Sequence, residues 1–208
     1  MVYGFVASKI DGTEHEFKVD EKMKMPVSYT YKDNLPSILN QGAKPICVPC
    51  AISAFINWSI NVDNNYNTKT DHNVDVMSIY NSRTTPGNTG MTYKDAFKFI
   101  RNKGVKTNIG NYTIDEYFKL GSIIQLQQAL ICNGPCLGAL PVYDDRRYDF
   151  WYEKPNDKFL GGHAIAIVGY NQKGFLIRNS WGKFWGDKGY TLLEYDEFKS
   201  FYEIWSVI

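Results

Sequence analysis

The stretch from Gln41 to Phe55 constrains the fold of this chain more than any other part of the sequence. It begins as a polar loop that contains Gly42 and Pro45 and continues into an almost entirely apolar segment. Proline is disfavoured inside a helix but tolerated in its first turn, so Pro45 and Pro49 predict a helix that starts near Cys47. A cysteine at a helix N-terminus lies near unpaired N–H groups and the positive end of the helix dipole, which favour the thiolate. The sequence therefore predicts a nucleophilic Cys47.

The predicted helix is apolar on more than one side. Its apolar residues are too many to form a single stripe: Val48, Ala51, Ile52, Ala54, Phe55 and Ile56. A helix with this pattern is expected to be buried all round, as a central helix between two lobes would be.

A nucleophilic cysteine also needs a base, and a second dense stretch supplies one. Residues 161–170 read as a strand that two glycines open and that His163 leads. Nine residues after Tyr170, Asn179 begins the sequence Asn-Ser-Trp-Gly. The pairing of Gly174 to Arg178 with the preceding strand would bring Asn179 close to His163, because the two strands run in opposite directions through a short turn.

These three segments resemble the active-site segments of papain-like cysteine peptidases. In that family a Gln precedes the catalytic Cys by six positions, as Gln41 precedes Cys47 here. A His-Ala pair in the family heads a strand that ends in Val-Gly-Tyr, and its histidine corresponds to His163. A later Asn-Ser-Trp-Gly supplies the third catalytic residue, which corresponds to Asn179. Local signatures do not transfer between families of cysteine peptidases, so three segments in the right order count for more than any one. The resemblance extends from about residue 29 to the C-terminus.

The resemblance implies acyl transfer through a covalent acyl-enzyme. Cys47 would be the nucleophile and His163 would protonate the leaving amine. The neutral amide of Asn179 would orient the imidazole, so that a thiolate and an imidazolium form the resting pair. The Gln41 side chain and the Cys47 backbone N–H would stabilise the oxyanion.

The resemblance also implies substrate-binding residues. The family presents a Gly-Gly pair to the substrate backbone, but only Gly90 stands here, and Met91 at the second position either approaches the substrate or lines a subsite wall. Ala139 and Ala164 match positions that line the main specificity pocket of the family. Trp181 is expected to cover the hydrogen bond between the catalytic imidazole and amide. Most members also have Trp after the nucleophile, where this chain has Val48, which leaves the subsite geometry open.

The fold class expected from this pattern is α+β, with a papain-like arrangement of two lobes and the active site in the cleft between them. We expect a single domain over residues 1–208 with an N-terminal extension (1–26), a helical lobe (about 27–135) and an antiparallel β-rich lobe (about 136–208). The chain changes character near Cys136, where glycine-bounded apolar runs replace helical spacing.

The N-terminal extension carries short alternating stretches around Asp11-Gly12, which predict a hairpin. Papain-like enzymes commonly carry a long helical pro-segment that plugs the cleft, and this extension is too short for one and lacks its pattern. Either the chain has been trimmed or its activity is controlled differently.

Composition restricts the partners. A chain of 208 residues with 44% apolar residues can bury one substantial core, or two lobes that share an interface, and we expect a monomer. The 23 basic and 22 acidic side chains leave no electrostatic footprint for a nucleic acid. No apolar run approaches the roughly 20 residues that span a bilayer, so no membrane partner is expected. The expected partner is a peptide or protein substrate, with no cofactor and no metal.

The cysteines bear on the cellular compartment of the protein and on the alternative hypothesis of a zinc site. The chain has four cysteines, and assigning Cys47 to catalysis leaves an odd number, which indicates a reducing compartment. Residues 1–4 lead into mixed polar sequence, so if Met1 is the native start we expect a cytoplasmic protein. The cysteines at 47, 50, 132 and 136 could instead bind zinc. The second pair brackets a proline turn and the first belongs to the proposed catalytic loop, which favours catalysis.

Two further alternatives remain. A papain-fold protein could bind peptides or a partner without cleaving them, although such a protein needs neither a thiolate nor its base. Within the enzyme hypothesis an endopeptidase is expected, while an exopeptidase or an amidase acting on other substrates stays open. His15 and His72 lack catalytic neighbours in the sequence and are expected at the surface.

Overall fold

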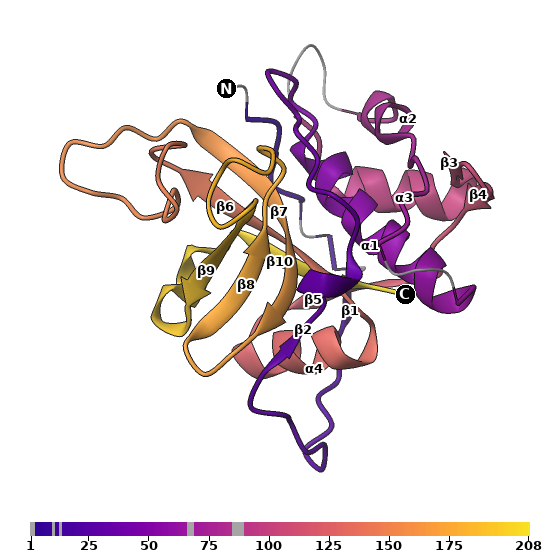
Figure 1. Ribbon diagram of the computed structural model, residues 1–208, viewed down its shortest axis with the longest axis horizontal. Coiled ribbons are helices and arrows are strands. Elements are labelled where there is room, and N and C mark those ends of the chain that lie inside the picture. Colours follow the sequence, from indigo (N-terminus) through magenta and orange to yellow (C-terminus); the bar gives the residue numbers. More distant parts are fainter. Residues whose placement is uncertain (1–2, 10, 13, 66–68, 85–89) are drawn as a thin grey trace.

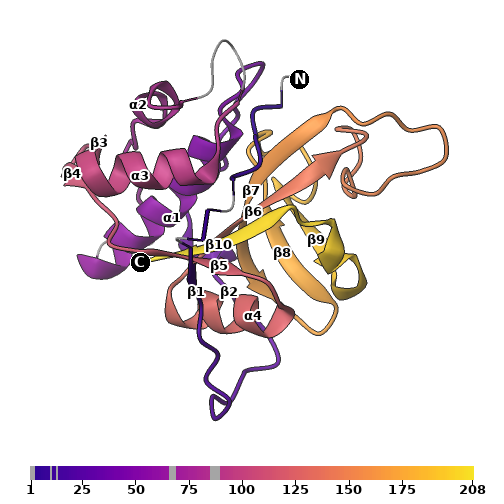
Figure 2. The same ribbon diagram turned by 180° about the vertical axis from the view of Figure 1, so that it is seen from behind.

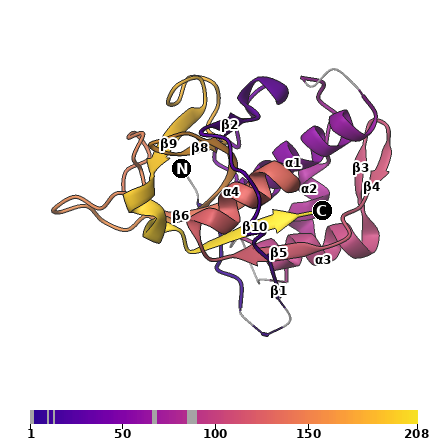
Figure 3. The same cartoon turned by 90° about the horizontal axis from the view of Figure 1, so that it is seen from below.

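The computed structural model describes residues 3–9, 11–12, 14–65, 69–84 and 90–208. Helices α1 (Cys47–Asp63), α2 (Val76–Asn81) and α3 (Tyr93–Lys103) gather on one side with the small hairpin β3 (Val105–Thr107) and β4 (Gly110–Tyr112). An extended sheet forms the other side (Figure 1). Figure 3 shows the three helices opposite strands β6, β8 and β9. The predicted α+β division into a helical and a sheet lobe is confirmed.

The main sheet has the order β1-β5-β10-β6-β7-β8-β9, and β2 pairs with β7 off this path. Its pairs are antiparallel except for β1 with β5, which is parallel. Its strands are β1 (His15–Glu16), β2 (Tyr29–Thr30), β5 (Tyr117–Leu120), β6 (Cys136–Val142), β7 (Gly161–Tyr170), β8 (Gly174–Arg178), β9 (Tyr190–Glu194) and β10 (Glu203–Val207). Short 3-10 helices cover Lys32–Asn34 and Tyr195–Ser200.

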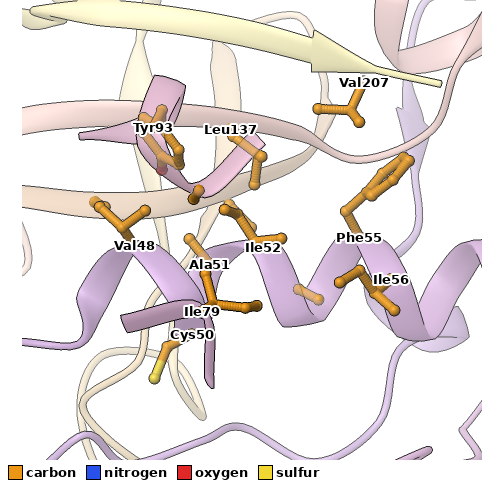
Figure 4. Packing of buried hydrophobic residues seen from close by; sticks show 14 of the residues in the cluster. Val48, Cys50, Ala51, Ile52, Phe55, Ile56, Ile79, Tyr93, Leu137 and Val207 are labelled. Atoms are coloured by element: carbon orange, nitrogen blue, oxygen red, sulfur yellow. The ribbon is translucent and has the colours of Figure 1, made fainter. Parts of the chain in front are cut away.

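Helix α1 lies at the centre of the molecule, between α2 and α3 on one side and β6 and β7 on the other. It begins at Cys47, as Pro45 and Pro49 predict. Every residue from Cys47 to Asn57 is buried, so its apolar pattern matches its environment on all sides. Figure 4 shows Ile52 and Phe55 pointing toward the sheet residues Leu137 and Val207, while Cys50 points away from them.

This packing predicts a strong effect of truncating Phe55. The side chain is 2% exposed, so Phe55→Ala should lower the free energy of unfolding by about 3–5 kcal/mol through lost burial and the cavity left behind. Val62 on the same helix is 49% exposed, and Val62→Ala should change stability by less than about 0.5 kcal/mol. Urea denaturation of the two variants measures both values. Equal effects would contradict the central burial of α1.

Helix α4 (Ile123–Cys132) falls within the predicted helical lobe, which was expected to end near residue 135, but it packs with the sheet. It is a helix, as its amphipathic pattern predicts, but its main contacts are with strands β10, β7 and β6 of the sheet. Leu126, Ala129 and Leu130 share a buried cluster with Ile165 and Ile167 of β7. The helical lobe therefore ends before β5, because the apolar face of α4 needs the cover that the sheet offers.

The predicted N-terminal hairpin is wrong. Strand β1 pairs with β5 and not with residues 3–6. The Asp11-Gly12 turn is instead closed by Glu14, whose carboxylate accepts both backbone N–H groups at 3.1 and 3.0 Å. Residues 4–6 find main-chain partners elsewhere, in the space between the two lobes.

The two remaining histidines differ from one another. His15 is exposed, as predicted. His72 is buried, with 1% exposure, contrary to the prediction. Its ring nitrogens lie 2.8 Å from Asn61 Oδ1 and 3.2 Å from Asn108 Oδ1. Each ring nitrogen therefore has a polar partner, which offsets the cost of removing the ring from water.

Candidate active site

Cys47 opens α1 and is fully buried. The residue that caps the helix, Ile46, offers no side-chain hydrogen bond to the first turn, so the helix N-terminus remains an electropositive end next to the sulfur. Burial nevertheless raises the pKa of the Cys47 thiol to about 11, opposed by hydrogen bonds from the backbone of Ala164 and Gly4. The thiol is thus the favoured form here, in contrast to the thiolate that the helix terminus alone predicts, because desolvation outweighs the helix dipole.

His163 lies in β7, fully buried, and its Nε2 is 2.7 Å from Asn179 Oδ1. The same Oδ1 accepts the backbone N–H of Ser180 at 2.7 Å. An N–H can only donate, so this atom is the amide oxygen and His163 Nε2 must carry a proton toward it. Burial lowers the pKa of His163 to about 4, opposed by the bond to Asn179, so the ring is neutral at pH 7. Nδ1 is then the basic nitrogen, and it is buried with no hydrogen-bond partner among the described residues.

Aromatic rings enclose the imidazole. The Trp181 ring stacks on the imidazole of His163, with ring centroids 4.5 Å apart and planes at 28°. It thus lies against the ring that is hydrogen-bonded to Asn179. Phe150 approaches the same imidazole edge-on at 5.6 Å. Phe150 belongs to residues 144–158, where the sequence shows no usable periodicity, so nothing in the sequence indicated this contact. The two rings contribute to the burial of the imidazole, and this burial lowers the pKa of His163.

Gln41 is buried in the loop before α1, and two bonds hold its amide. Its Oε1 accepts from Ser180 Oγ at 2.7 Å and its Nε2 donates to Lys44 O at 3.2 Å. The backbone joins the same two segments, since Gln41 N donates to Ser180 O at 2.9 Å and Gly182 N donates to Leu39 O at 3.0 Å. The loop that carries Gln41 is therefore built onto the loop that carries Asn179. Ser180, which orients Gln41, is a site residue that the sequence did not single out.

The residues expected to bind substrate lie around Cys47, but the chain itself covers them. Met91 is fully buried; its N–H donates to Gly4 O at 2.8 Å and its carbonyl accepts from Val6 N at 3.1 Å. On the opposite wall, Phe5 N donates to Gly162 O at 3.3 Å. An extended segment that includes Gly4, Phe5 and Val6 therefore lies where the sequence predicts a substrate.

Of the other predicted substrate-binding residues, Ala139 of β6 and Ala164 of β7 are paired in register and fully buried. Ala164 contacts the Cys47 thiol through its backbone. Gly90, next to Met91, is also buried and lies against Gly4.

Comparison with known proteins identifies the family. A family model described as papain family cysteine protease matches residues 80–203, which is more than half of the chain and includes His163 and Asn179. The chain belongs to the papain family of cysteine proteases.

Curated relatives of this papain-family chain match a part of it. The gut-specific cysteine proteinase of Caenorhabditis elegans is 31% identical over 86 residues, which cover 38% of this chain and 26% of that protein. Cathepsin B-like cysteine proteinase 1 of Haemonchus contortus is 32% identical over 85 residues, covering 38% of this chain and 25% of that protein. The match thus spans about a quarter of the length of these relatives.

Solved structures share the fold of the papain-family chain along nearly all of its length. Xylellain, a cysteine protease from Xylella fastidiosa, superposes with a TM-score of 0.83 at 19% identity and covers 99% of this chain and 95% of its own. ProCathepsin B S9 from Trypanosoma congolense gives a TM-score of 0.81 at 15% identity, covering 99% of this chain and 86% of its own. The predicted papain-like fold is confirmed, including the region before residue 80 that carries Cys47.

The remaining cysteines of this papain-family chain are free thiols. Cys50 and Cys136 are buried and Cys132 is exposed. Within the described part of the chain, no group of three or more His, Cys, Asp or Glu side chains is arranged to hold a metal ion. In the same part of the chain, none of the helices has the length and apolar character needed to cross a membrane.

Proposed function

We propose that this chain is a cysteine peptidase that hydrolyses peptide bonds through Cys47, His163 and Asn179. The observation that carries the proposal is the double acceptance by Asn179 Oδ1, from Ser180 N–H and from His163 Nε2, which leaves His163 Nδ1 as the basic nitrogen. Ala164, the residue after His163, contacts the Cys47 thiol. A thiol and a basic imidazole nitrogen are the two groups that acyl transfer by cysteine requires.

The chemistry proceeds in two halves. The proton of the Cys47 thiol passes to His163, and the sulfur attacks the substrate carbonyl carbon. The resulting oxyanion accepts hydrogen bonds from the Gln41 amide and the Cys47 backbone N–H. The C–N bond breaks as His163 returns the proton to the leaving amine, which leaves a thioester. Water, deprotonated by His163, then attacks the thioester and releases the carboxylic acid, and the proton returns to the sulfur.

An endopeptidase fits this cleft best. The segment that lies in it continues on both sides of Cys47: Tyr3 on one side reaches Asp145, and Ser8 on the other reaches Glu203. A cleft that accommodates a chain beyond the reacting position in both directions suits cleavage within a polypeptide. Digestion of a peptide library, with Cys47→Ala as the inactive partner, tests the proposal and reports whether cuts are internal or terminal.

The protonation states predict a pH profile for alkylation. A pKa of about 11 means that Cys47 is a thiol at pH 7, so its rate of alkylation by iodoacetamide should rise about tenfold per pH unit and level off only near pH 11. Intact-mass measurement with peptide mapping follows Cys47, and exposed Cys132 serves as an internal reference. A profile for Cys47 that is already flat at pH 7 would contradict a desolvated thiol.

A further inference from the structure

We propose that Cys47 and Cys50 form a redox-active dithiol, in which a hydroperoxide oxidises Cys47 and Cys50 then closes a disulfide within α1. The motif is Cys47-Val48-Pro49-Cys50, a C-X-X-C sequence whose first cysteine is also the first residue of the helix. Two cysteines at this spacing, next to a helix N-terminus, are a setting that favours reactive thiols. In the proposed function only Cys47 has a task, and the dithiol gives one to Cys50.

The geometry of a helix brings the two cysteines within bonding range. A rise of about 1.5 Å and a turn of about 100° per residue place Cα atoms three residues apart at about 5 Å. Disulfides join cysteines whose Cα atoms are about 4.4–6.8 Å apart. The first residues of a helix have no acceptor for their N–H groups within it. Cys47 can therefore turn toward Cys50 while the hydrogen bonds of the later turns stay in place.

Both thiols lie near the same residue of β7. Helix α1 and strand β7 lie side by side (Figure 2). The Cys47 thiol is hydrogen-bonded by the backbone of Ala164. Cys50 lines a small cavity, of about 10 Å³, together with Ala164 and Asn179. A space of this size holds about one water molecule and leaves the Cys50 side chain room to turn toward Cys47.

The surroundings assign different roles to the two sulfurs. Burial raises the pKa of both thiols, to about 11 for Cys47 and to about 12 for Cys50. Backbone hydrogen bonds lower the pKa of Cys47, whereas the charge of an ionised Cys47 raises the pKa of Cys50. Oxidation starts from the thiolate. Cys47 is therefore the sulfur that a hydroperoxide oxidises, and Cys50 stays a thiol until it closes the disulfide.

The oxidation takes two steps. The Cys47 sulfur attacks one oxygen of the hydroperoxide, the O–O bond breaks, and the other oxygen leaves with the thiol proton as an alcohol, or as water from hydrogen peroxide. The product is a sulfenic acid on Cys47. The Cys50 sulfur then attacks the Cys47 sulfur, the S–O bond breaks, and the hydroxyl group leaves with the Cys50 proton as water. Two thiols are thus oxidised to one disulfide, the hydroperoxide is reduced, and an external dithiol reverses the change by exchange.

The disulfide protects the nucleophile from irreversible oxidation. A sulfenic acid that meets more hydroperoxide becomes a sulfinic acid, which a thiol reductant does not reverse. Cys50 reacts before a second hydroperoxide because the same helix holds it one turn away. While the disulfide persists, the Cys47 sulfur cannot attack a substrate carbonyl. This consequence for activity rests on the proposed function, whereas formation of the disulfide does not.

The test uses the full chain, reduced beforehand, as wild type, as Cys50→Ala and as the matched control Cys136→Ala, which removes a buried free thiol from β6. Each is treated with hydrogen peroxide at mildly alkaline pH, where more of Cys47 is ionised, and half of each sample is then reduced with dithiothreitol. Mass spectrometry of the tryptic peptide 33–69, which contains Cys47 and Cys50 and no other cysteine, is the first readout. Hydrolysis of a fluorogenic peptide library is the second.

In the wild type and in Cys136→Ala, the peptide should become lighter by two hydrogen atoms. Hydrolysis by these two proteins should fall roughly tenfold or more and return with dithiothreitol. In Cys50→Ala the peptide should become heavier by two oxygen atoms, and the activity that dithiothreitol restores should be about tenfold lower than in the wild type. A disulfide in the peptide without hydrolysis by any reduced protein would support the dithiol and overturn the peptidase.

Three results would overturn the dithiol. They are a sulfinic acid on Cys47 of the wild type with no disulfide, full recovery of Cys50→Ala, and an unmodified peptide at a dose that oxidises the exposed Cys132. Should Cys50→Ala not fold, as judged by circular dichroism, Cys50→Ser carries the same expectation.

Discussion

Cys47→Ala is expected to abolish peptide hydrolysis, with kcat lower by on the order of 10⁵ or more, because no other group forms the thioester. The loss should appear as the difference from the wild type, measured under the same conditions. Substrate binding should remain, since the methyl group of alanine fills part of the same space.

Cys50→Ala is the matched control for this experiment. Cys50 lies one turn further into α1 and is also buried, but its side chain points away from Leu137 and Val207. Its truncation should leave kcat within about twofold of the parent, with a small loss of stability. Initial rates at saturating substrate give kcat for the two alanine variants. Substantial hydrolysis by Cys47→Ala, or its loss in Cys50→Ala alone, would refute Cys47 as the nucleophile.

Gln41→Ala should lower kcat by about 10²–10³, equivalent to about 2.7–4 kcal/mol, and change KM little. The Gln41 amide has two hydrogens, and one of them goes to Lys44 O, which leaves the other for the oxyanion. Because the oxyanion exists only in the transition state, the loss belongs in kcat.

Gln127→Ala serves as the control for an amide lost elsewhere. Its Nε2 donates to the Tyr195 hydroxyl at 2.9 Å, a bond between α4 and the 3-10 helix Tyr195–Ser200 that involves none of the proposed site residues, so both kinetic constants should stay near the parent values. Steady-state kinetics of the two variants and of the wild type provide both constants. An effect of Gln41→Ala on KM alone would mean that Gln41 binds substrate and does not stabilise the oxyanion.

Residues that lie close together in the chain could be assigned from the sequence. Prolines at 45 and 49 restrict where a helix can begin, and α1 begins at Cys47 as they predict. The apolar runs at 161–170 and 174–178 form adjacent antiparallel strands joined by a short turn, which brings His163 to Asn179. Both inferences rest on backbone chemistry that acts within a few residues.

Contacts between distant segments could not be assigned in this way. Ser180 orients Gln41 across 139 positions, and Phe150 reaches the His163 ring from a segment with no regular pattern. Local periodicity indicates which face of an element is apolar but not which element covers it. For the same reason the amphipathic pattern of α4 predicts a helix but does not predict that it packs on the sheet.

By itself the sequence determined the start of α1 at Cys47, the order of the site residues and the division into helices and sheet, because these follow from local backbone preferences and from residue types at short spacing. Only the tertiary structure decided that Gly4 lies against the Cys47 thiol and that the thiol and the imidazole are neutral there. Both depend on how completely water is removed from Cys47 and His163, and desolvation is the sum of everything that packs around a group from all parts of the chain.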